Sequence, residues 1–327
     1  MNKQRKKKIS IIVPVYNEQD AIKSFLDQKL LPEIKHISDY YVELILINDG
    51  SSDKTLPILQ SYAKNNSYIK VISFARNFGK EAALSAALIY ATGDVAIFID
   101  ADGQHPPQLI PEFIAKWEKT NAHIIVGLRD HYSKHGLIQR IGSKLFYKLL
   151  SAMGNKNTIP GSTDYRLIDR VVIDDYNQLT EHNRITRGLI DWLGYPQEFI
   201  TYTPSARMAG KPSYNIKKLF KLAINSFISM STTPLVIFGY IGIFITIASF
   251  LLGVFVIINQ FILGDPLHLY WNGAVQMSIL ISFLVGLVLI SQAITALYIS
   301  HIHAETQGRP LYIIDKHNSR NINQKEQ

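Results

Sequence analysis

DVAIFIDADGQHPP, residues 94–107, is a stretch in which an apolar run ends at two carboxylates. Residues 95–99 are apolar and flanked by charge, which predicts a buried strand, and Asp100 begins the turn that follows it. Side chains two apart on an extended backbone point the same way, so Asp100 and Asp102 can share one ligand. Two convergent carboxylates suit a hard divalent cation, Mg²⁺ or Mn²⁺, with Gln104 as a third oxygen ligand. The alternative, a polar turn with solvated acids, is disfavoured by the motifs that accompany this one.

Strands and helices alternate over the first 130 residues. Strands are predicted over 9–15, 42–47, 69–74, 95–99 and 123–127, and helices over 19–31, 55–65 and 80–91. This alternation predicts an α/β fold with a mostly parallel sheet covered by helices, and with ligands bound beyond the carboxyl ends of the strands. Polar turns follow the first four strands, namely PVYNE at 14–18, NDGSSD at 48–53, RNFGK at 76–80 and DADGQ at 100–104. Each turn alone would be an ordinary capped connection, but together they form a nucleotide-sized site.

Other nucleotide-binding classes lack their signatures in this chain. A dinucleotide-binding Rossmann domain needs Gly-x-Gly-x-x-Gly after its first strand, and the corresponding turn, VPVYNE at 13–18, has no glycine. No Gly-Lys-Ser/Thr phosphate loop occurs in the sequence. The sequence therefore disfavours NAD and ATP as ligands. It also has no cysteine, which excludes disulfides and thiolate metal sites.

The apolar residues of the second half predict two membrane helices. No Asp, Glu, Lys or Arg occurs in residues 222–264, and none occurs again in residues 266–304. Within these windows, residues 235–263 and 274–300 are both longer than the roughly 20 residues that a helix needs to cross a hydrocarbon core. Two buried core helices are the alternative, and they are disfavoured because soluble helices of this length carry charge on one face.

Charge sets the predicted orientation in the membrane. Lysines at 217, 218 and 221 precede the first span and basic residues at 309, 316, 320 and 325 follow the second, whereas the loop 265–272 has no Lys or Arg. The positive-inside rule then places both termini in the cytoplasm. The net charge of +8 suits an anionic membrane surface, on which the amphipathic segments 216–229 and 135–153 are expected to lie. No motif favours nucleic acid as a partner.

The motifs resemble those of the family 2 glycosyltransferases of GT-A fold. The resemblance rests on VPVYNE at 13–18, NDGSSD at 48–53, and DAD with QHPP at 100–107. Downstream, GSTDYRL at 161–167, RGL at 187–189 with Trp192, and RMAGKPSY at 207–214 narrow it to the polyisoprenyl-phosphate glycosyltransferases. These include bactoprenol glucosyltransferases and dolichol-phosphate mannose synthases. Asn48, where many members have Asp, and the displaced lysine in GKPSY, 210–214, are departures from the family pattern.

The resemblance implies a domain organisation for the chain. We expect a basic N-terminal tail, a GT-A domain, a juxtamembrane amphipathic helix, a two-helix transmembrane domain and a cytoplasmic C-terminal tail, over residues 1–8, 9–212, 213–233, 234–303 and 304–327 respectively. It is then an integral protein of the bacterial plasma membrane, and its spans also offer a surface for self-association.

The resemblance also implies the reaction and its residues. A sugar passes from a nucleoside diphosphate to a long-chain isoprenyl phosphate, with inversion at the anomeric carbon. The expected donor-binding residues are Pro14, Tyr16, Glu18, Asp49, Lys80 and Asp100. Asp164 and Asp102 are expected to be catalytic, and the metal ligands are Asp100, Asp102 and Gln104. A phosphate monoester is already ionised near pH 7, so Asp164 is either a general base or a group that orients a cation. Cationic side chains are expected to grip the acceptor phosphate, and the candidates are Arg166, Arg187, Arg207 and Lys211.

The identity of the sugar stays open at this point. Glucose from UDP-glucose is the first expectation, and mannose, an N-acetylhexosamine or an amino-arabinose derivative are the alternatives. A processive polysaccharide synthase would show a Gln-x-x-Arg-Trp motif, which is absent. A membrane scaffold that only binds nucleotide would have no need of both Asp100 and Asp102.

Overall fold

The computed structural model describes residues 6–130, 161–182, 184–204, 251, 254, 258 and 273–322. The chain divides into two compact units, one made of Met1–Asn215 with Arg309–Gln327 and the other of Ile216–Gly308. The first unit contains the α/β domain, and it includes the C-terminal segment of the chain.

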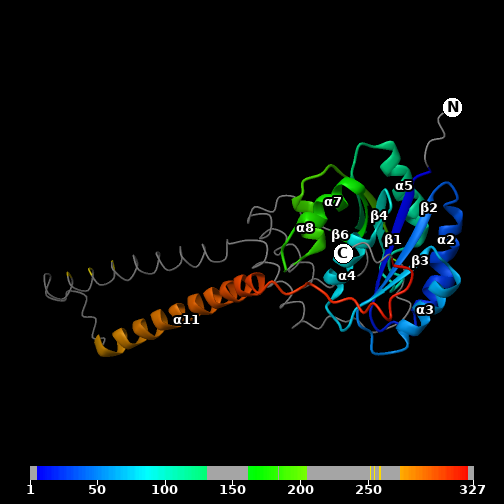
Figure 1. Cartoon of the computed structure of the whole chain (residues 1–327). Helices are drawn as coiled ribbons and strands as arrows, with labels where there is room; N and C mark the ends of the chain where they lie inside the picture. Colours follow the sequence, from blue (N-terminus) through cyan, green and yellow to red (C-terminus); the bar gives the residue numbers. More distant parts are fainter. Residues whose placement is uncertain are drawn as a thin grey trace. The chain divides into compact units, whose positions relative to one another are not determined.

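A seven-stranded sheet forms the centre of the first unit, in the order β3-β2-β1-β4-β6-β5-β7 (Figure 1). The strands are β1 (Lys8–Val15), β2 (Tyr41–Asn48), β3 (Ile69–Ser73), β4 (Val95–Phe98), β5 (Ile124–Arg129), β6 (Ser162–Asp169) and β7 (Gln197–Tyr202). Only β6 runs antiparallel to its neighbours, β4 and β5, and every other pair in the sheet is parallel. The prediction of a mostly parallel α/β sheet is therefore confirmed.

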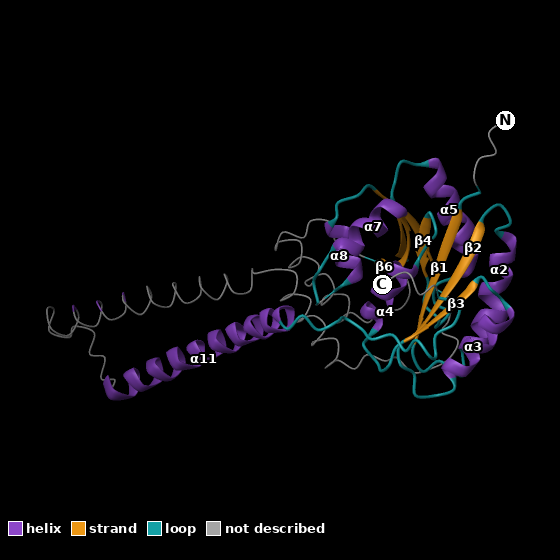
Figure 2. Ribbon diagram, in the orientation of Figure 1, coloured by secondary structure: helices purple, strands orange, loops and turns teal. Residues whose placement is uncertain are grey.

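The alternation of apolar residues along the strands produces a core on each face of the sheet. Ile11 of β1 and Leu44 of β2 belong to one buried cluster, whereas Ile12 and Ile45 belong to the other. Because successive side chains of a strand point to opposite faces, a run of apolar residues such as β1 must be covered on both sides. The two faces are visible as helices on either side of the strands in Figure 2.

The helices of this unit follow the predicted order. They are α1 (Ile22–Ser24), the π-helical η1 (Phe25–Leu30), α2 (Leu31–His36), α3 (Thr55–Asn65), α4 (Lys80–Tyr90), the 3₁₀ turn η2 (Pro107–Leu109), α5 (Ile110–Lys119), α7 (Arg170–Gln178) and α8 (Thr186–Trp192). The predicted helix 55–65 coincides with α3, and the predicted helix 80–91 ends one residue later than α4. The predicted helix 19–31 is observed as three successive helical segments that extend to His36.

The second unit is described mainly through α11 (Gly273–Thr306), a helix of 34 residues. It covers the second predicted span, 274–300, so the helical conformation of that segment is confirmed. Among the residues that the structure describes, however, no helix is found that is both long and apolar enough to cross a membrane. The first predicted span, 235–263, lies outside the described residues except at positions 251, 254 and 258. The predicted amphipathic segments 135–153 and 216–229 lie wholly outside the described residues. The membrane spans therefore stay predictions.

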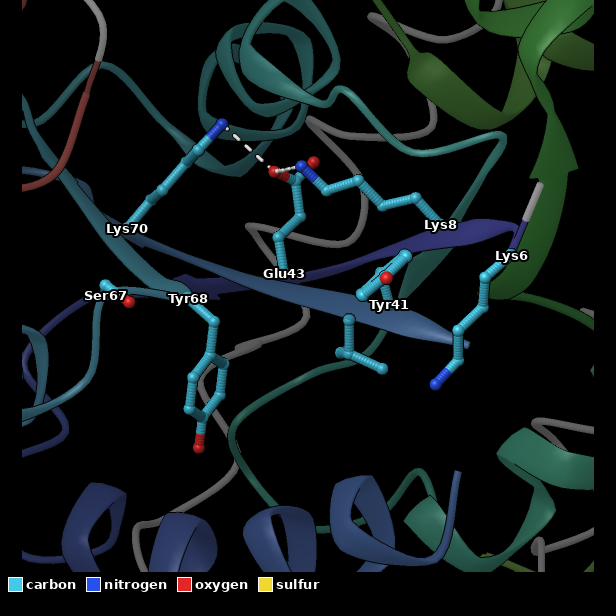
Figure 3. A pocket seen from close by; sticks show the side chains of 8 residues that line it. Lys6, Lys8, Tyr41, Glu43, Ser67, Tyr68 and Lys70 are labelled. Atoms are coloured by element: carbon cyan, nitrogen blue, oxygen red, sulfur yellow. Dashed lines mark ion pairs between the residues drawn. The ribbon is translucent and has the colours of Figure 1, made fainter. Parts of the chain in front are cut away.

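A charged cavity lies where β1, β2 and β3 begin, at the edge of the sheet opposite to the polar turns (Figure 3). The Glu43 carboxylate is buried beneath it and pairs with Lys8 at 2.8 Å and with Lys70 at 3.0 Å. Ser10 Oγ and the Thr92 backbone N–H also donate to Glu43 Oε1. Lys8 and Lys70 thus neutralise a buried carboxylate, which ties β1, β2 and β3 together at their amino ends.

Candidate functional site

The antiparallel strand β6 brings Asp164 beside the end of β4. Phe98, the last residue of β4, pairs with Arg166 of β6, so the first residues of β6 lie next to the turn that begins at Asp100. The carboxyl end of β4 and the amino end of β6 therefore share one edge of the sheet. This arrangement brings the carboxylates of Asp100 and Asp164, which are 64 residues apart in the sequence, into one site.

Lys80 joins these two carboxylates. It is the first residue of α4, and its Nζ lies 2.7 Å from Asp100 Oδ1 and 2.9 Å from Asp164 Oδ2. Burial lowers the pKa of Lys80, but the two carboxylates outweigh that effect and raise it above its usual value. The predicted donor-binding lysine is thus a permanent cation at the centre of the site.

Asp164 is held in its ionised form. Burial raises the pKa of its carboxyl group, but the positive charges of Lys80, Arg187 and Arg166 more than compensate and hold the pKa well below its usual range. A carboxylate with such a low pKa is a weak proton acceptor. The geometry shows the Asp164 carboxylate paired with the Lys80 ammonium, and its two predicted roles, general base and orienting group, both stay predictions.

His105 supports the turn that begins at Asp100. The backbone N–H of Asp100 donates to His105 Nδ1 at 3.1 Å, and the imidazole stacks on the Tyr165 ring with centroids 4.9 Å apart. Burial lowers the pKa of His105, and an accepting Nδ1 requires the neutral ring with its proton on Nε2. His105 has no predicted role, and its place in the motif QHPP, residues 104–107, is the one sequence signal for it.

The predicted metal ligands lie in one turn. Asp102 is half-buried, and its Oδ1 accepts the backbone N–H of Gln104 at 3.0 Å, which fixes the turn. Within the described ranges, no group of three or more His, Cys, Asp or Glu side chains gathers in a metal-holding arrangement. The protein would therefore offer a divalent cation two carboxylates, Asp100 and Asp102, which suits an ion that completes its shell with water and substrate phosphate. The Lys80 ammonium against Asp100 already marks this place as one that favours positive charge. Asp100 and Asp102 are the residues that would hold the predicted Mg²⁺ or Mn²⁺, and Asp100 would share its carboxylate with Lys80.

Asp49 holds a loop in place. Its buried carboxylate accepts the backbone N–H of Phe78 at 2.7 Å and that of Gly79 at 2.9 Å, together with Asn77 Nδ2 at 2.9 Å. Burial raises the pKa of Asp49, and the hydrogen bonds from Phe78 and Gly79 oppose this effect. Asp49, a predicted donor-binding residue, thus fixes the loop 76–79 immediately before Lys80.

The remaining predicted donor residues lie at the end of β1. Pro14 is half-buried within the strand, and Tyr16 just after it is 47% exposed. Glu18 is half-buried and its backbone N–H donates to Thr55 Oγ1 at 2.9 Å. These residues share the carboxyl edge of the sheet with Asp49 and Asp100, because β1 lies between β2 and β4.

The predicted acceptor residues separate into different environments. Arg166 is only 1% exposed, and its guanidinium pairs with Asp191 at 3.1 Å and donates to Ser162 Oγ at 3.3 Å. A buried, paired guanidinium cannot reach a bound lipid phosphate without leaving its partner, so this geometry favours a structural role for Arg166. Arg187, on α8, is exposed and its Nη1 donates to the Ser162 carbonyl at 3.3 Å. Arg207 and Lys211 lie outside the described residues.

Glu81 is a half-buried acid with no predicted role. It follows Lys80 on α4, and its carboxylate accepts the backbone N–H of Thr186 at 2.7 Å. Burial, reinforced by the Asp164 charge, raises the pKa of Glu81. It links the beginning of α4 to that of α8, and therefore joins the helix of Lys80 to the helix of Arg187. No sequence signal distinguished it from an ordinary acid in the first turn of a helix.

Comparison with known proteins defines the class of this α/β domain. The sequence model of the family described as glycosyl transferase family 2 matches residues 10–176. The chain is 37% identical to the bactoprenol glucosyl transferase of Shigella phage SfX over 94% of this chain and 98% of that protein. It is 36% identical to the prophage bactoprenol glucosyl transferase homolog of Escherichia coli K12, over 94% of this chain and 99% of that protein. Among solved structures, glucosyl-3-phosphoglycerate synthase from Mycobacterium tuberculosis has a TM-score of 0.49 and 20% identity, over 67% of this chain and 75% of that one.

The matches to the family model and to these relatives, together with the seven-stranded sheet, describe an α/β transferase domain. The chain belongs to glycosyl transferase family 2 and is a glycosyltransferase. The resemblance drawn from the sequence motifs is confirmed.

Proposed function

We propose that this chain transfers a hexose from a nucleotide sugar to a polyisoprenyl phosphate, with glucose from UDP-glucose as the donor. One observation carries the chemistry, namely that the Lys80 ammonium lies between the carboxylates of Asp100 and Asp164 at the ligand-binding edge of the sheet. Relatives that match nearly the whole chain carry the name bactoprenol glucosyl transferase, and this supports the acceptor and the sugar. Mannose from GDP-mannose is the alternative donor.

The reaction joins an acceptor phosphate oxygen to the anomeric carbon and breaks the bond from that carbon to the nucleoside diphosphate. The acceptor oxygen is already ionised near neutral pH, so attack needs no strong base. Lys80 supplies positive charge beside the departing diphosphate, and such preorganised charge is a large term in catalysis. A divalent cation held by Asp100 and Asp102 would supply Lewis-acid stabilisation of the same leaving group. Attack on the face opposite to the leaving group inverts the anomeric carbon.

Asp164 organises the cations of the site in this proposal. Its ionised carboxylate holds Lys80 directly, and the charge of Arg187 acts on it as well. Arg187 is exposed and therefore accessible to an acceptor phosphate, and Arg207 and Lys211 stay proposed as further phosphate contacts. Arg166 then has a structural role in the site, through its ion pair with Asp191.

We further propose that the protein works at the cytoplasmic face of the bacterial plasma membrane. The two charge-free segments and the distribution of basic residues around them support this placement, because the lipid acceptor lies there and nucleotide sugars are cytoplasmic. Self-association through the membrane segments stays a prediction.

A donor panel tests the proposal directly. Membranes containing the full chain are incubated with undecaprenyl phosphate, Mn²⁺ or Mg²⁺, and radiolabelled UDP-glucose, UDP-N-acetylglucosamine or GDP-mannose, and label is measured in the organic phase. We expect label from UDP-glucose in the extracted lipid. Exclusive use of GDP-mannose would replace the donor, and label in insoluble polymer would favour a polysaccharide synthase. If no donor gave any transfer, the alternative function, a membrane scaffold that only binds nucleotide, would be favoured.

A further inference from the structure

The C-terminal segment, residues 309–322, is part of the glycosyltransferase domain. It follows α11 in sequence, yet it belongs to the same compact unit as the sheet. Figure 1 shows it in red beside β3, the strand at one end of the sheet. From the sequence, this region is predicted to belong to a cytoplasmic C-terminal tail, residues 304–327.

The segment pairs with the free edge of β3. Arg320 exchanges both backbone hydrogen bonds with Val71, at 2.8 and 3.0 Å, and the Asp315 N–H donates to the Ser73 carbonyl at 2.7 Å. Ser319 is 6% exposed, and its Oγ accepts the Ser73 N–H at 3.0 Å. An unpaired edge strand exposes backbone donors and acceptors, and this segment satisfies those of β3.

The beginning of the segment reaches the connection that leads to the active site. The Tyr312 ring stacks on Phe74 with centroids 5.0 Å apart and planes 10° from parallel. Phe74 in turn contacts Phe78 edge to face at 5.7 Å, and the Ala75 N–H donates to the Ile313 carbonyl at 2.9 Å. The segment therefore contacts the chain on both sides of the point where β3 ends.

That connection is the loop 76–79, which presents Lys80. Its far end is held by Asp49 through the backbone N–H groups of Phe78 and Gly79. The two residues that precede the loop, Phe74 and Ala75, are held by Tyr312 and Ile313. Gly79 has a φ of 99°, so the chain turns sharply before Lys80 begins α4. The position of the Lys80 ammonium depends on both anchors.

We infer that the C-terminal segment is a positioning element of the active site, and that Tyr312 acts through Phe74 and Phe78 to hold Lys80 between its two carboxylates. The inference about turnover rests on the proposed function, whereas the inference about the loop does not. The segment thus has a catalytic consequence in addition to closing the sheet edge.

The test compares three variants of the full chain. Tyr312→Ala removes the stacked ring, and Tyr312→Phe keeps it. Gln60→Ala is the matched control. The Gln60 side chain donates to the Asn318 carbonyl at 2.8 Å, so its removal loosens the segment at a position away from Tyr312. Should Tyr312→Ala fail to fold, Tyr312→Leu takes its place, since it keeps apolar bulk without the stacked ring.

Two measurements are made on each variant. Hydrogen exchange is followed in the peptide that contains residues 74–83, and kcat and KM are measured with UDP-glucose and undecaprenyl phosphate. We expect Tyr312→Ala to speed exchange in that peptide about tenfold or more, and to lower kcat by about tenfold with little change in KM for the acceptor. Tyr312→Phe and Gln60→Ala should match the wild type in both measurements.

The inference is overturned if exchange in the 74–83 peptide is unchanged in Tyr312→Ala, or if Gln60→Ala speeds it equally. Unchanged kcat alongside faster exchange would remove the catalytic consequence. A wild-type chain that transfers no sugar would overturn the proposed function, and the exchange comparison would still decide whether Tyr312 holds the loop.

Discussion

Lys80 is the residue on which the site depends, because it neutralises two carboxylates that come from different strands. Removing its charge leaves Asp100 and Asp164 facing each other without a cation, which raises the pKa of Asp164. We expect Lys80→Met to lower the initial rate of sugar transfer by on the order of 100-fold, since loss of a preorganised charge costs about that much. Lys54→Met is the control, because Lys54 is exposed and lies outside the site. A Lys80→Met rate close to that of the wild type would contradict this role.

Asp102 tests the metal at the same scale. Asp102→Asn keeps the size of the side chain and removes one anionic oxygen ligand, so turnover should fall by on the order of 100-fold or more while the midpoint of thermal unfolding changes little. Adding EDTA to the wild-type enzyme should have the same effect, and Mn²⁺ or Mg²⁺ should reverse it. The exposed turn residue Asp39, changed to Asn, serves as control. Full activity of the wild type in EDTA would exclude a metal role.

Glu43 makes stability depend on pH. Burial raises its pKa, but hydrogen bonds from Lys8, Ser10 and Thr92 outweigh it and lower the pKa from 4.5 to about 2. Because the folded-state pKa lies below the unfolded value, the contribution is fully present above pH 4.5 and is lost as the pH falls toward 2. It amounts to about 3 kcal/mol at neutral pH, at roughly 1.4 kcal/mol per pKa unit.

Glu43→Gln should therefore lower the unfolding midpoint of the full chain at pH 7. The difference in unfolding midpoint between the wild type and Glu43→Gln should shrink as the pH is lowered from 4.5 toward 2. The measurement is thermal unfolding at a series of pH values from 7 down to about 2, which covers the window between the two pKa values. An equal difference between the two proteins at every pH would mean that the Glu43 charge contributes nothing.

At the scale of elements, the turn after β2 packs on the loop that carries Lys80. Gly50 has a φ of 63°, and a Cβ there would lie 2.2 Å from the Arg76 carbonyl carbon and 2.5 Å from the Asn77 nitrogen. Gly50→Ala must push the loop away, because both contacts are backbone atoms. Gly308 provides a matched control, since its φ is 59° and a Cβ there would meet nothing within 4 Å.

Gly308→Ala should show only the cost of a left-handed conformation, about 1–2 kcal/mol. Gly50→Ala should add an overpacking cost of about 1–3 kcal/mol and a fall in kcat. Thermal unfolding and initial rates measure the two effects. Equal losses in the two variants would show that the contact between the turn and the loop is unimportant.

Most elements of the sheet could be predicted because their signals are local. The strand at 95–99 and the helix at 55–65 follow from apolar runs and periodicity, and both are observed within one residue. The strands β6 and β7 were missed. In β6, residues such as Asp164 and Arg166 interrupt the apolar pattern, because one end of the strand belongs to the active site.

At the scale of the whole molecule, the predicted membrane topology can be tested because the chain has no cysteine. A single cysteine is then a unique label. Asn272→Cys, in the predicted outer loop, should react with a membrane-impermeant maleimide on intact spheroplasts. Gln324→Cys, near the C-terminus, should react only after permeabilisation. Labelling of both positions, or of neither, on intact spheroplasts would contradict two spans with cytoplasmic termini.

The α/β class, the polar turns at one edge of the sheet and the family could all be predicted from the residues alone. Those features depend on neighbouring residues, through strand alternation, helix periodicity and short motifs at strand ends. Only the tertiary structure decided that Lys80 bridges Asp100 and Asp164, because that contact requires β6 to run antiparallel beside β4. It also decided that Arg166 is buried against Asp191, and that residues 309–322 return to the edge of β3. Backbone pairing between distant segments leaves little trace in residue types, since any residue other than proline offers the same N–H and C=O groups.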